Sequence, residues 1–133
     1  MNVVILGCGR VGARLAAMLD KNGHRVSVID RTLEAFDRLP NDFKGLVVLG
    51  QGVDQDILSQ AGIEQADAFC TLSNDDNINI MASQVATAVF HVPRVITRIY
   101  DPRRQDTYTT LGLESICPTR VGVDRIEQLL GVE

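Results

Sequence analysis

The first thirty residues, MNVVILGCGRVGARLAAMLDKNGHRVSVID (residues 1–30), decide the fold. A short apolar run, VVIL, leads directly into the glycine-rich stretch GCGRVG (residues 7–12). Apolar positions then recur at helical spacing over residues 10–22, and a second apolar run ends in Asp30. The order of strand, glycine turn, helix, strand and acid is typical of a β-α-β unit that binds a nucleotide.

The same alternation of apolar runs and amphipathic stretches continues to the end of the chain. Capping and breaking residues mark its boundaries: Pro40 stops the second helix, Gly62 closes the third, Asp101-Pro102 begins the fifth and Thr119 caps the sixth. We therefore expect strands at residues 3–6, 25–29, 46–49, 68–72, 94–99 and 115–117, and helices at residues 10–22, 32–39, 54–60, 75–90, 101–111 and 121–130.

Six strand–helix pairs with almost wholly apolar strands predict a parallel sheet that is covered by helices on both faces. Right-handed crossovers leave few topologies for such a sheet. We expect a doubly wound α/β Rossmann fold with six parallel strands in the order 3-2-1-4-5-6. No linker or repeat interrupts the pattern, so residues 1–133 are expected to form a single nucleotide-binding domain.

Composition excludes several classes of protein. The net charge of −4 disfavours a nucleic-acid partner, which would require a basic face. No apolar run approaches the roughly 20 residues that span a bilayer, and the first run is too short for a signal peptide, so a cytoplasmic protein is expected. The three cysteines, Cys8, Cys70 and Cys117, lack C-x-x-C spacing, which disfavours a disulfide scaffold and a metal site.

The glycines of the turn have distinct expected roles. Gly7 allows the tight turn, Gly9 lets a pyrophosphate approach the backbone, and Gly12 lets the helix pack closely on the strand. The phosphates would then lie on unpaired N–H groups at the start of the helix. A plain turn without a ligand is the alternative. Cys8 is either a reactive thiol near a helix N-terminus or a small residue that fills the turn.

The acid after the second strand bears on the choice of ligand. The carboxylate of Asp30 can accept hydrogen bonds from both ribose hydroxyls, which favours NAD(H) or an adenine nucleotide over NADP. Arg31 keeps NADP open, because an arginine can bind a 2′-phosphate.

Other candidates lie at the switch point of the expected sheet. Ser73 and Asn74 either contact the pyrophosphate or cap the long helix. Arg98 either meets a phosphate or forms an ion pair with Asp101 or a neighbouring acid. Arg10 either reaches a phosphate or a partner subunit, or is solvated.

The residues that a dehydrogenase needs for proton transfer are not apparent. His24 and His91 are expected at the edge opposite the ligand, and neither Tyr100 nor Tyr108 has a lysine at a fixed helical spacing. We therefore expect a protein that is not an enzyme. A small NAD-dependent oxidoreductase, or the cofactor-binding half of one, is the alternative, and a homologue that has lost nucleotide binding is a third possibility.

Five stretches, GCGRVG, VID, GQGVDQDILSQAGIEQADAF, TLSNDDNIN and VPRVITRIYDP, resemble the N-terminal domain of the RCK/TrkA-type potassium transport regulators. The resemblance covers essentially the whole chain. It implies a cytoplasmic module, at the inner face of the membrane through a transporter subunit, that binds NAD(H) or ATP, ADP or AMP. It further implies a homodimer or larger ring that gates a membrane potassium channel or transporter.

The resemblance also implies which residues hold the nucleotide. The family often reads G-D-A-T-D where this chain reads G-Q-G-V-D (residues 50–54), so that Gln51 replaces an acid and Val53 a hydroxyl. The family's second, C-terminal ligand-binding domain is not in this sequence, which is either an isolated domain or part of a longer chain. The implied site residues are Gly7, Cys8, Gly9, Arg10, Val11, Gly12, Asp30, Arg31, Gln51, Gly52, Val53, Ser73, Asn74 and Arg98.

The last helices bear on assembly. In the helix over residues 75–90 we expect Ile78, Met81, Val85 and Val89 to cover the sheet, which leaves Ile80 and several alanines toward the opposite side. The final helix adds five apolar positions that nothing later in the sequence covers. Partly exposed apolar helix faces favour association, so at least a dimer is expected, and burial of both faces within one copy is the alternative.

Overall fold

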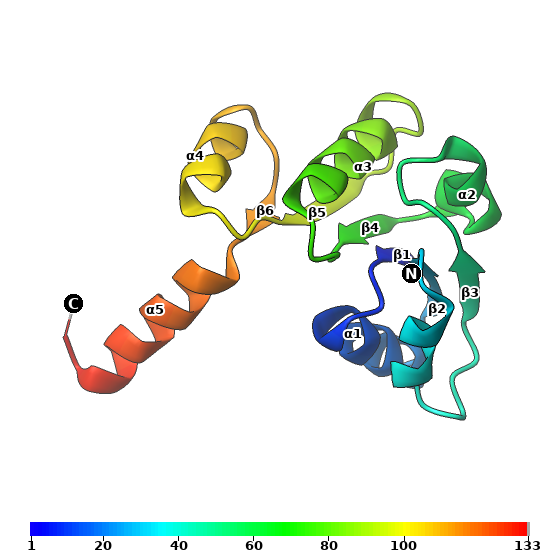
Figure 1. Ribbon diagram of the computed structural model, residues 1–133, viewed down its shortest axis with the longest axis horizontal. Coiled ribbons are helices and arrows are strands. Elements are labelled where there is room, and N and C mark those ends of the chain that lie inside the picture. Colours follow the sequence, from blue (N-terminus) through cyan, green and yellow to red (C-terminus); the bar gives the residue numbers. More distant parts are fainter. Residues whose placement is uncertain (133) are drawn as a thin grey trace.

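The computed structural model describes residues 1–132 and forms a six-stranded parallel sheet in the order β3-β2-β1-β4-β5-β6 (Figure 1). This confirms the expected doubly wound α/β fold. The strands are β1 (Asn2–Leu6), β2 (Arg25–Asp30), β3 (Leu46–Leu49), β4 (Ala68–Thr71), β5 (Arg94–Arg98) and β6 (Ser115–Ile116).

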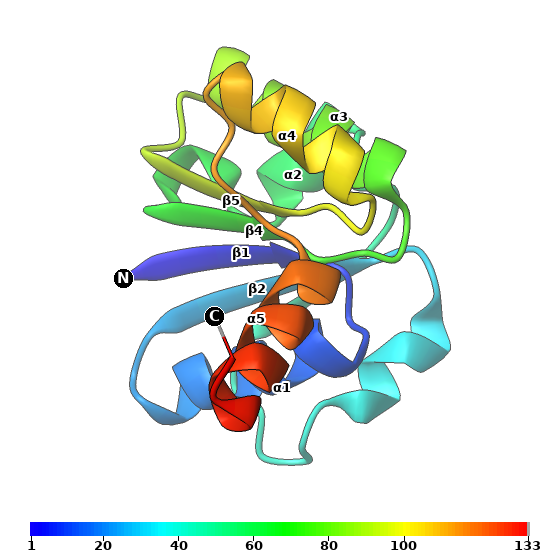
Figure 2. The ribbon, with the colours of Figure 1, turned by 90° about the vertical axis from the view of Figure 1, so that its left-hand side faces the viewer.

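Helices cover both faces of the sheet. Figure 2 shows α1 on one face and α2, α3 and α4 on the other. The sheet's apolar side chains fill the two layers between, with Ile5 completely buried beneath α1 and Phe69 completely buried on the side of α2 and α3. The helices are α1 (Arg10–Lys21), α2 (Gln55–Gln60), α3 (Asp76–Ala88), α4 (Pro102–Thr110) and α5 (Pro118–Leu130).

Aspartates begin three of these helices. The carboxylates of Asp54, Asp75 and Asp101 each accept a hydrogen bond from a backbone N–H in the first turn that follows. These side chains satisfy donors that have no partner within the helix, which explains why the three starts were predictable.

Two predicted helices differ from the expectation. The segment after β2 is a 3₁₀ helix, η1 (Leu33–Arg38), and an unpredicted 3₁₀ helix, η2 (Ile63–Gln65), precedes β4. The last helix begins at Pro118, so the expectation that Thr119 caps it is wrong. Proline has no N–H to lose and its φ already fits the first helical position, which makes Pro118 a natural start.

The face of α3 that covers the sheet was predicted only in part: Ile78 and Val85 pack against the core as expected, but Met81 and Val89 do not. Ile80, Ala82 and Ala86 are buried against the sheet, whereas the side chains of Met81 and Val89 are 52% and 46% exposed. Small alanine side chains let the helix approach the sheet closely, and Met81 and Val89 lie outward.

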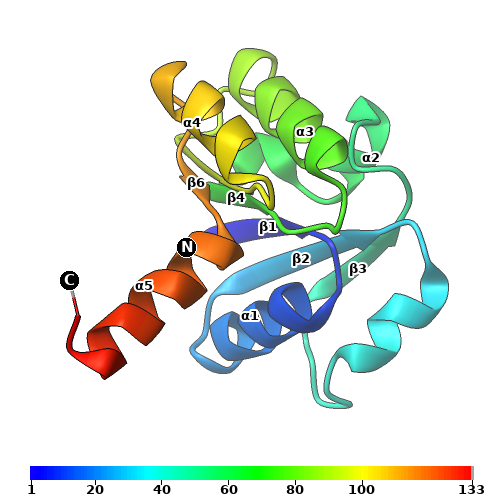
Figure 3. The same cartoon turned by 60° about the vertical axis from the view of Figure 1, so that its left-hand side comes forward.

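The α5 helix stands away from the rest of the molecule (Figures 1 and 3). Every residue from Thr119 to Leu130 is exposed. The expectation that nothing in this chain covers its apolar side chains holds for the described residues. None of the helices within residues 1–132 is long and apolar enough to cross a membrane.

Candidate functional site

A pocket of about 660 Å³ opens at the carboxyl ends of β1, β2 and β4. The β1–α1 turn and the β4–α3 loop lie at this same edge of the sheet (Figure 3). We call this pocket the edge pocket. In doubly wound sheets ligands bind at this edge, where the strand order reverses. The predicted site residues that line it are Gly7, Cys8, Gly9, Asp30, Arg31, Gln51, Gly52, Ser73, Asn74 and Arg98.

Four predicted residues do not line the edge pocket. Arg10 and Val11 begin α1 and are exposed, Gly12 is buried between α1 and β1, and Val53 packs against the core. The structure therefore brings together the turn, the acid and the β4–α3 loop, whereas Arg10 is exposed and does not line the pocket.

Two glycines of the turn are required by the protein itself. Gly7 has a φ of +104°, and a Cβ there would lie 2.7 Å from the amide nitrogen of Ser73. A Cβ on Gly12 would lie 1.8 Å from the carbonyl oxygen of Gly7. The close packing of α1 on the strand that was expected at Gly12 is confirmed.

Gly9 differs from these two. A Cβ at Gly9 would meet no atom of the described chain within 4 Å, and its φ of −86° is accessible to any residue. The residue lines the edge pocket and is the N-cap of α1, a position that serine or aspartate would stabilise. The folded chain therefore leaves open space at Gly9 that its own packing does not use.

The first turn of α1, directly after Gly9, carries backbone donors without partners. The amide of Ala13 donates to the carbonyl oxygen of Gly9 at 2.9 Å, which closes the first turn. Within the described chain the amides of Arg10, Val11 and Gly12 have no acceptor, as expected for the first turn of a helix. Such amides bind anions well, and phosphate in particular.

Asp30 fastens the end of β2 to the glycine turn. Its carboxylate accepts hydrogen bonds from the amides of Cys8 and Thr32, each at 2.9 Å. Each carboxylate oxygen retains a further lone pair, so the group can still accept from ribose hydroxyls. The sequence suggested only the contact with a ligand, and the link to Cys8 was missed because the pattern does not show which backbone donors face the acid.

The thiol of Cys8 is buried in this turn. Burial, reinforced by the negative charge of Asp30, raises its pKa from 9.0 to about 11. The thiol is therefore protonated at neutral pH, and the interpretation of Cys8 as a reactive residue is wrong. Cys8 fills the turn as a small apolar side chain.

The β4–α3 loop separates two roles that the sequence left open. Asp75 is the N-cap of α3 and accepts from the amides of Asn77 and Ile78. Asn74 is therefore not the cap, and it lines the edge pocket instead. The hydroxyl of Ser73 donates to the carbonyl-type oxygen of Asn79 at 2.7 Å, which fixes the loop from beneath.

Arg98 is almost wholly buried and lines the same pocket. Its guanidinium donates to the carbonyl oxygens of Leu72 and Ser73, and it lies 4.8 Å from the centre of the Tyr100 ring. The alternative of an ion pair with Asp101 is wrong: that carboxylate caps α4 and lies 3.8 Å from Arg103.

One lining residue with a clear contact was missed by sequence reasoning. Arg38, in η1, donates to the carbonyl oxygen of Cys8 at 3.4 Å and lines the edge pocket beside Glu34 and Asp37. The signal was available, since these three charged residues fall on one side of a short helix that follows directly after Asp30.

The lining also bears on catalysis. No histidine, lysine or tyrosine lines the edge pocket in the part of the chain that the structure describes. His24 lies near the first residue instead, with its Nδ1 3.0 Å from the amino group of Met1. Within residues 1–132 no cluster of three or more potential ligands for a metal ion is present.

Known proteins resemble this chain along most of its length. The model of the TrkA-N domain family matches residues 3–118. A Trk system potassium uptake protein TrkA from Streptomyces coelicolor is 48% identical over 126 residues, which cover 95% of this chain and 56% of that protein. The chain spans about half the length of the curated relatives it matches.

Solved structures agree on the fold. The TrkA-N domain of the inner membrane protein ybaL from Escherichia coli has a TM-score of 0.85 at 21% identity, covering 97% of this chain and 96% of that one. The GsuK channel bound to NAD has a TM-score of 0.79 at 27% identity, covering 97% and 23%. GsuK bound to ADP has a TM-score of 0.78 at 27% identity, covering 96% and 33%.

These names agree with the expectation of a protein that is not an enzyme, since the curated relatives are potassium uptake proteins. The family model and the relative from Streptomyces coelicolor together cover nearly all of the described residues. The chain belongs to the TrkA-N domain family.

Proposed function

We propose that this chain is a regulatory domain that binds NAD(H) or an adenine nucleotide in the edge pocket and controls a membrane potassium channel or transporter. The observation that carries the proposal is the open space at Gly9. The fold itself explains Gly7 and Gly12, because a Cβ at either position would collide with backbone, but it gives no such reason at Gly9. A pyrophosphate that lies against the backbone of Gly9 would explain why this position is a glycine.

The order of the strands gives the ligand a direction. Asp30 ends β2, the glycine turn follows β1, and Ser73 follows β4, so these groups lie in the sheet order β2-β1-β4. A nucleotide would place its ribose hydroxyls at Asp30 and its first phosphate at the glycine turn. The part beyond that phosphate would extend toward Ser73 and Arg98.

Related proteins support the proposal of a nucleotide-binding domain in potassium transport. GsuK, at 27% identity, has been solved both with NAD and with ADP. The curated relatives are potassium uptake proteins of the Trk system. Because this chain spans about half of their length, the potassium transporter that it would regulate is part of the proposal.

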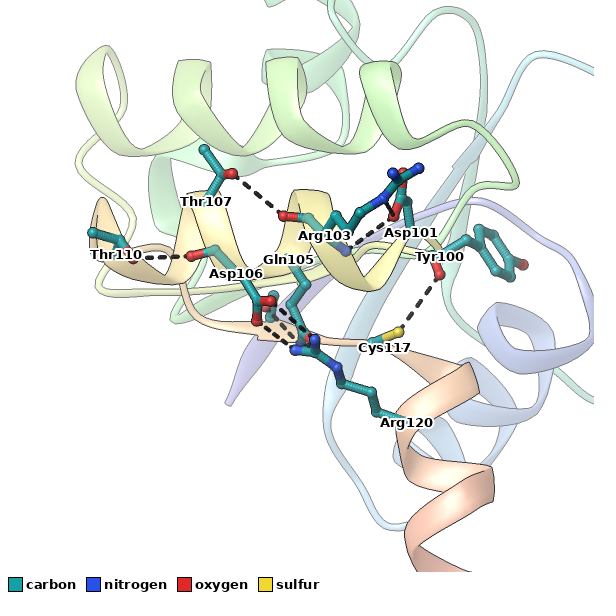
Figure 4. Close-up of polar contacts among 10 residues, drawn as sticks. Tyr100, Asp101, Arg103, Gln105, Asp106, Thr107, Thr110, Cys117 and Arg120 are labelled. Carbon is teal, nitrogen blue, oxygen red and sulfur yellow. Dashed lines mark hydrogen bonds and ion pairs between the residues drawn. The ribbon is translucent and has the colours of Figure 1, made fainter.

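A second copy of the chain is the partner proposed for α5. The helix exposes Val121, Val123, Ile126, Leu129 and Leu130. Its base is fixed to α4, because Arg120 forms an ion pair with Asp106 at 2.6 Å and also bonds Gln105 (Figure 4). The apolar face is therefore held away from the sheet, where a second copy can cover it in a homodimer or larger ring. Binding of the nucleotide would then shift the equilibrium between arrangements of the copies.

Calorimetric titration with NAD⁺, NADH, ATP, ADP and AMP tests the binding. At least one is expected to bind with one site per chain, and NADP is expected to bind more weakly than NAD⁺ because Asp30 disfavours a 2′-phosphate. Failure of all five to bind would refute the proposal. Turnover of NAD(H) with candidate substrates, well above the background rate, would favour the oxidoreductase instead.

A further inference from the structure

Asn79 is a completely buried polar residue that does not line the edge pocket. It lies in the first half of α3, on the face that covers the sheet. Its side-chain oxygen accepts from the amide of Ser73 at 3.0 Å and from the Ser73 hydroxyl at 2.7 Å. Its side-chain nitrogen donates to the carbonyl oxygens of Ser73 and Arg98, each at 3.0 Å. One amide group thus fixes the pocket's β4–α3 loop to the end of β5.

Arg98 depends on the same loop. Its guanidinium is held by the carbonyl oxygens of Leu72 and Ser73, so its position follows that of Ser73. The guanidinium has no acidic partner among the ion pairs of the described residues, and its buried Nε has no acceptor there. A buried cation in this condition is costly, and an anionic group entering the pocket would compensate for it.

The loop lies at one end of the proposed ligand path. AMP would reach from Asp30 to the glycine turn with its single phosphate. A second phosphate, or the second half of a dinucleotide, would continue toward β4 and β5, where Ser73 and Arg98 lie. The arrangement that Asn79 fixes at Ser73 and Arg98 would therefore bear on the part of a ligand beyond its first phosphate.

We propose that Asn79 is a positioning residue that sets the distal end of the edge pocket, so that the site prefers nucleotides with a group beyond the first phosphate over AMP. The proposal rests on the proposed function, because it assumes that the edge pocket holds a nucleotide. Asn79 would act through Ser73 and Arg98 and would not touch the ligand.

The same helix supplies a matched control. Ser83 lies one turn after Asn79 and is also completely buried on the sheet-facing side. Its hydroxyl lies 3.0 Å from that of Thr71 and is also hydrogen-bonded to Thr97, within the sheet and outside the lining of the edge pocket. Ser83→Ala therefore removes a buried polar group of α3 without disturbing the β4–α3 loop.

The test compares AMP, ADP and NAD⁺ by calorimetry on the wild type, Asn79→Asp and Ser83→Ala. The aspartate keeps the acceptor for Ser73 and replaces the donor that serves two carbonyl oxygens. ADP and NAD⁺ are expected to bind Asn79→Asp about tenfold more weakly, as for the loss of a hydrogen bond to a charged group, with AMP unchanged. Ser83→Ala is expected to bind all three like the wild type.

The outcomes separate this inference from the proposed function. If the wild type binds none of the three, the proposed function fails. If the wild type binds AMP as tightly as ADP and NAD⁺, or if Asn79→Asp weakens all three equally or none, the positioning role is refuted while nucleotide binding stands.

A measurement on the wild type covers the case in which Asn79→Asp does not fold. The amide of Ser73, which donates to Asn79, reports on the loop by hydrogen exchange. At equal saturation, ADP is expected to slow its exchange more than AMP does. Equal protection by the two ligands would overturn the proposal.

Discussion

Two regions of the molecule differ in how far the chain itself buries them: the glycine-turn region, residues 3–30, and the C-terminal segment, residues 102–130. In the first, β1 is buried almost throughout and a Cβ on Gly12 would collide with backbone. In the second, no residue of α4 or α5 is buried, and a Cβ on Gly122 would meet nothing of the described chain within 4 Å. One region is packed by the chain itself, and the other presents an apolar surface outward.

The two regions differ in the size of the partner that each can accommodate. In the packed region, the packing of the chain does not require a glycine at position 9. The open space there points to a small ligand, which would enter a pocket that the rest of the chain already forms. In the C-terminal segment, no other part of the described chain covers the apolar face of α5. Covering a whole helix face needs a partner as large as a second copy.

The largest expected effect is on folding at Gly12. Because its Cβ would lie 1.8 Å from the carbonyl oxygen of Gly7, Gly12→Ala is expected to lower the free energy of unfolding by about 3 kcal/mol or more. Gly122→Ala, in the exposed α5 helix, is expected to raise it by about 0.5–1 kcal/mol. Urea denaturation measures both. Equal effects at the two glycines would abolish the contrast between the regions.

The next effect concerns association through α5. Ile126 and Leu129 are 57% and 69% exposed in the single chain, so replacing both by serine removes little from its own core. If a second copy covers them, the dimer is expected to weaken by about a hundredfold or more. Analytical ultracentrifugation measures this. Asp124→Ser, on the opposite side of the helix, is the control, and a wild type that stays monomeric at micromolar concentration would contradict the assignment.

The thiol of Cys8 provides a pH-dependent test of the packed region. With its pKa at about 11, its thiolate population at pH 8 is about a hundredfold below that of a free cysteine. We expect iodoacetamide to alkylate Cys8 correspondingly slowly in the folded protein. Mass spectrometry measures the rate of alkylation, with the rate in the urea-unfolded chain as the reference.

The same shift affects stability with a definite sign. Since the folded state favours the protonated thiol, the contribution of Cys8 is complete below pH 9 and is lost as the pH rises toward about 11. Comparing the wild type with Cys8→Ala over this range isolates it. A contribution that increased with pH would show that the thiol is not held in its neutral form.

A smaller effect is expected at Asp30. Asp30→Ala removes acceptors for the ribose and should weaken nucleotide binding about tenfold. It also removes the partners of the amides of Cys8 and Thr32, so the variant alone does not separate the two roles. A 2′,3′-dideoxy nucleotide separates them. It should bind the wild type about tenfold more weakly than the normal nucleotide does, and it should bind Asp30→Ala as tightly as the normal nucleotide does. An equal preference in both proteins would place the ribose elsewhere.

Much of the fold was predictable because the signals are local. Apolar runs, aspartate caps and prolines identify most strands and helices within a few residues, and right-handed crossovers then give the strand order. The buried face of α3 was not predictable from periodicity, which favoured Met81 and Val89. Asn79 and Ser83 take the sheet-facing positions because their partners, Ser73, Arg98, Thr71 and Thr97, come from other elements.

In the candidate site, too, the features within one local motif were predictable and the contacts between distant elements were not. The glycine turn and Asp30 follow from a motif within one β-α-β unit. The alternative of an ion pair between Arg98 and Asp101 rested on nearness in sequence and is wrong, because the guanidinium donates to the carbonyl oxygens of Leu72 and Ser73. Those acceptors come from a neighbouring strand's loop, and no pattern in the sequence shows where a backbone carbonyl points.

We expect the open space at Gly9 to hold a phosphate of the bound nucleotide. Calorimetry with the tightest-binding of the five nucleotides, on the wild type and on Gly9→Val, tests it most directly, with circular dichroism and thermal unfolding to establish that the variant folds. We expect an intact fold, because a Cβ at Gly9 meets no atom of the described chain within 4 Å, and a loss of affinity of about a hundredfold or more. A folded Gly9→Val variant that binds the nucleotide as tightly as the wild type would contradict it.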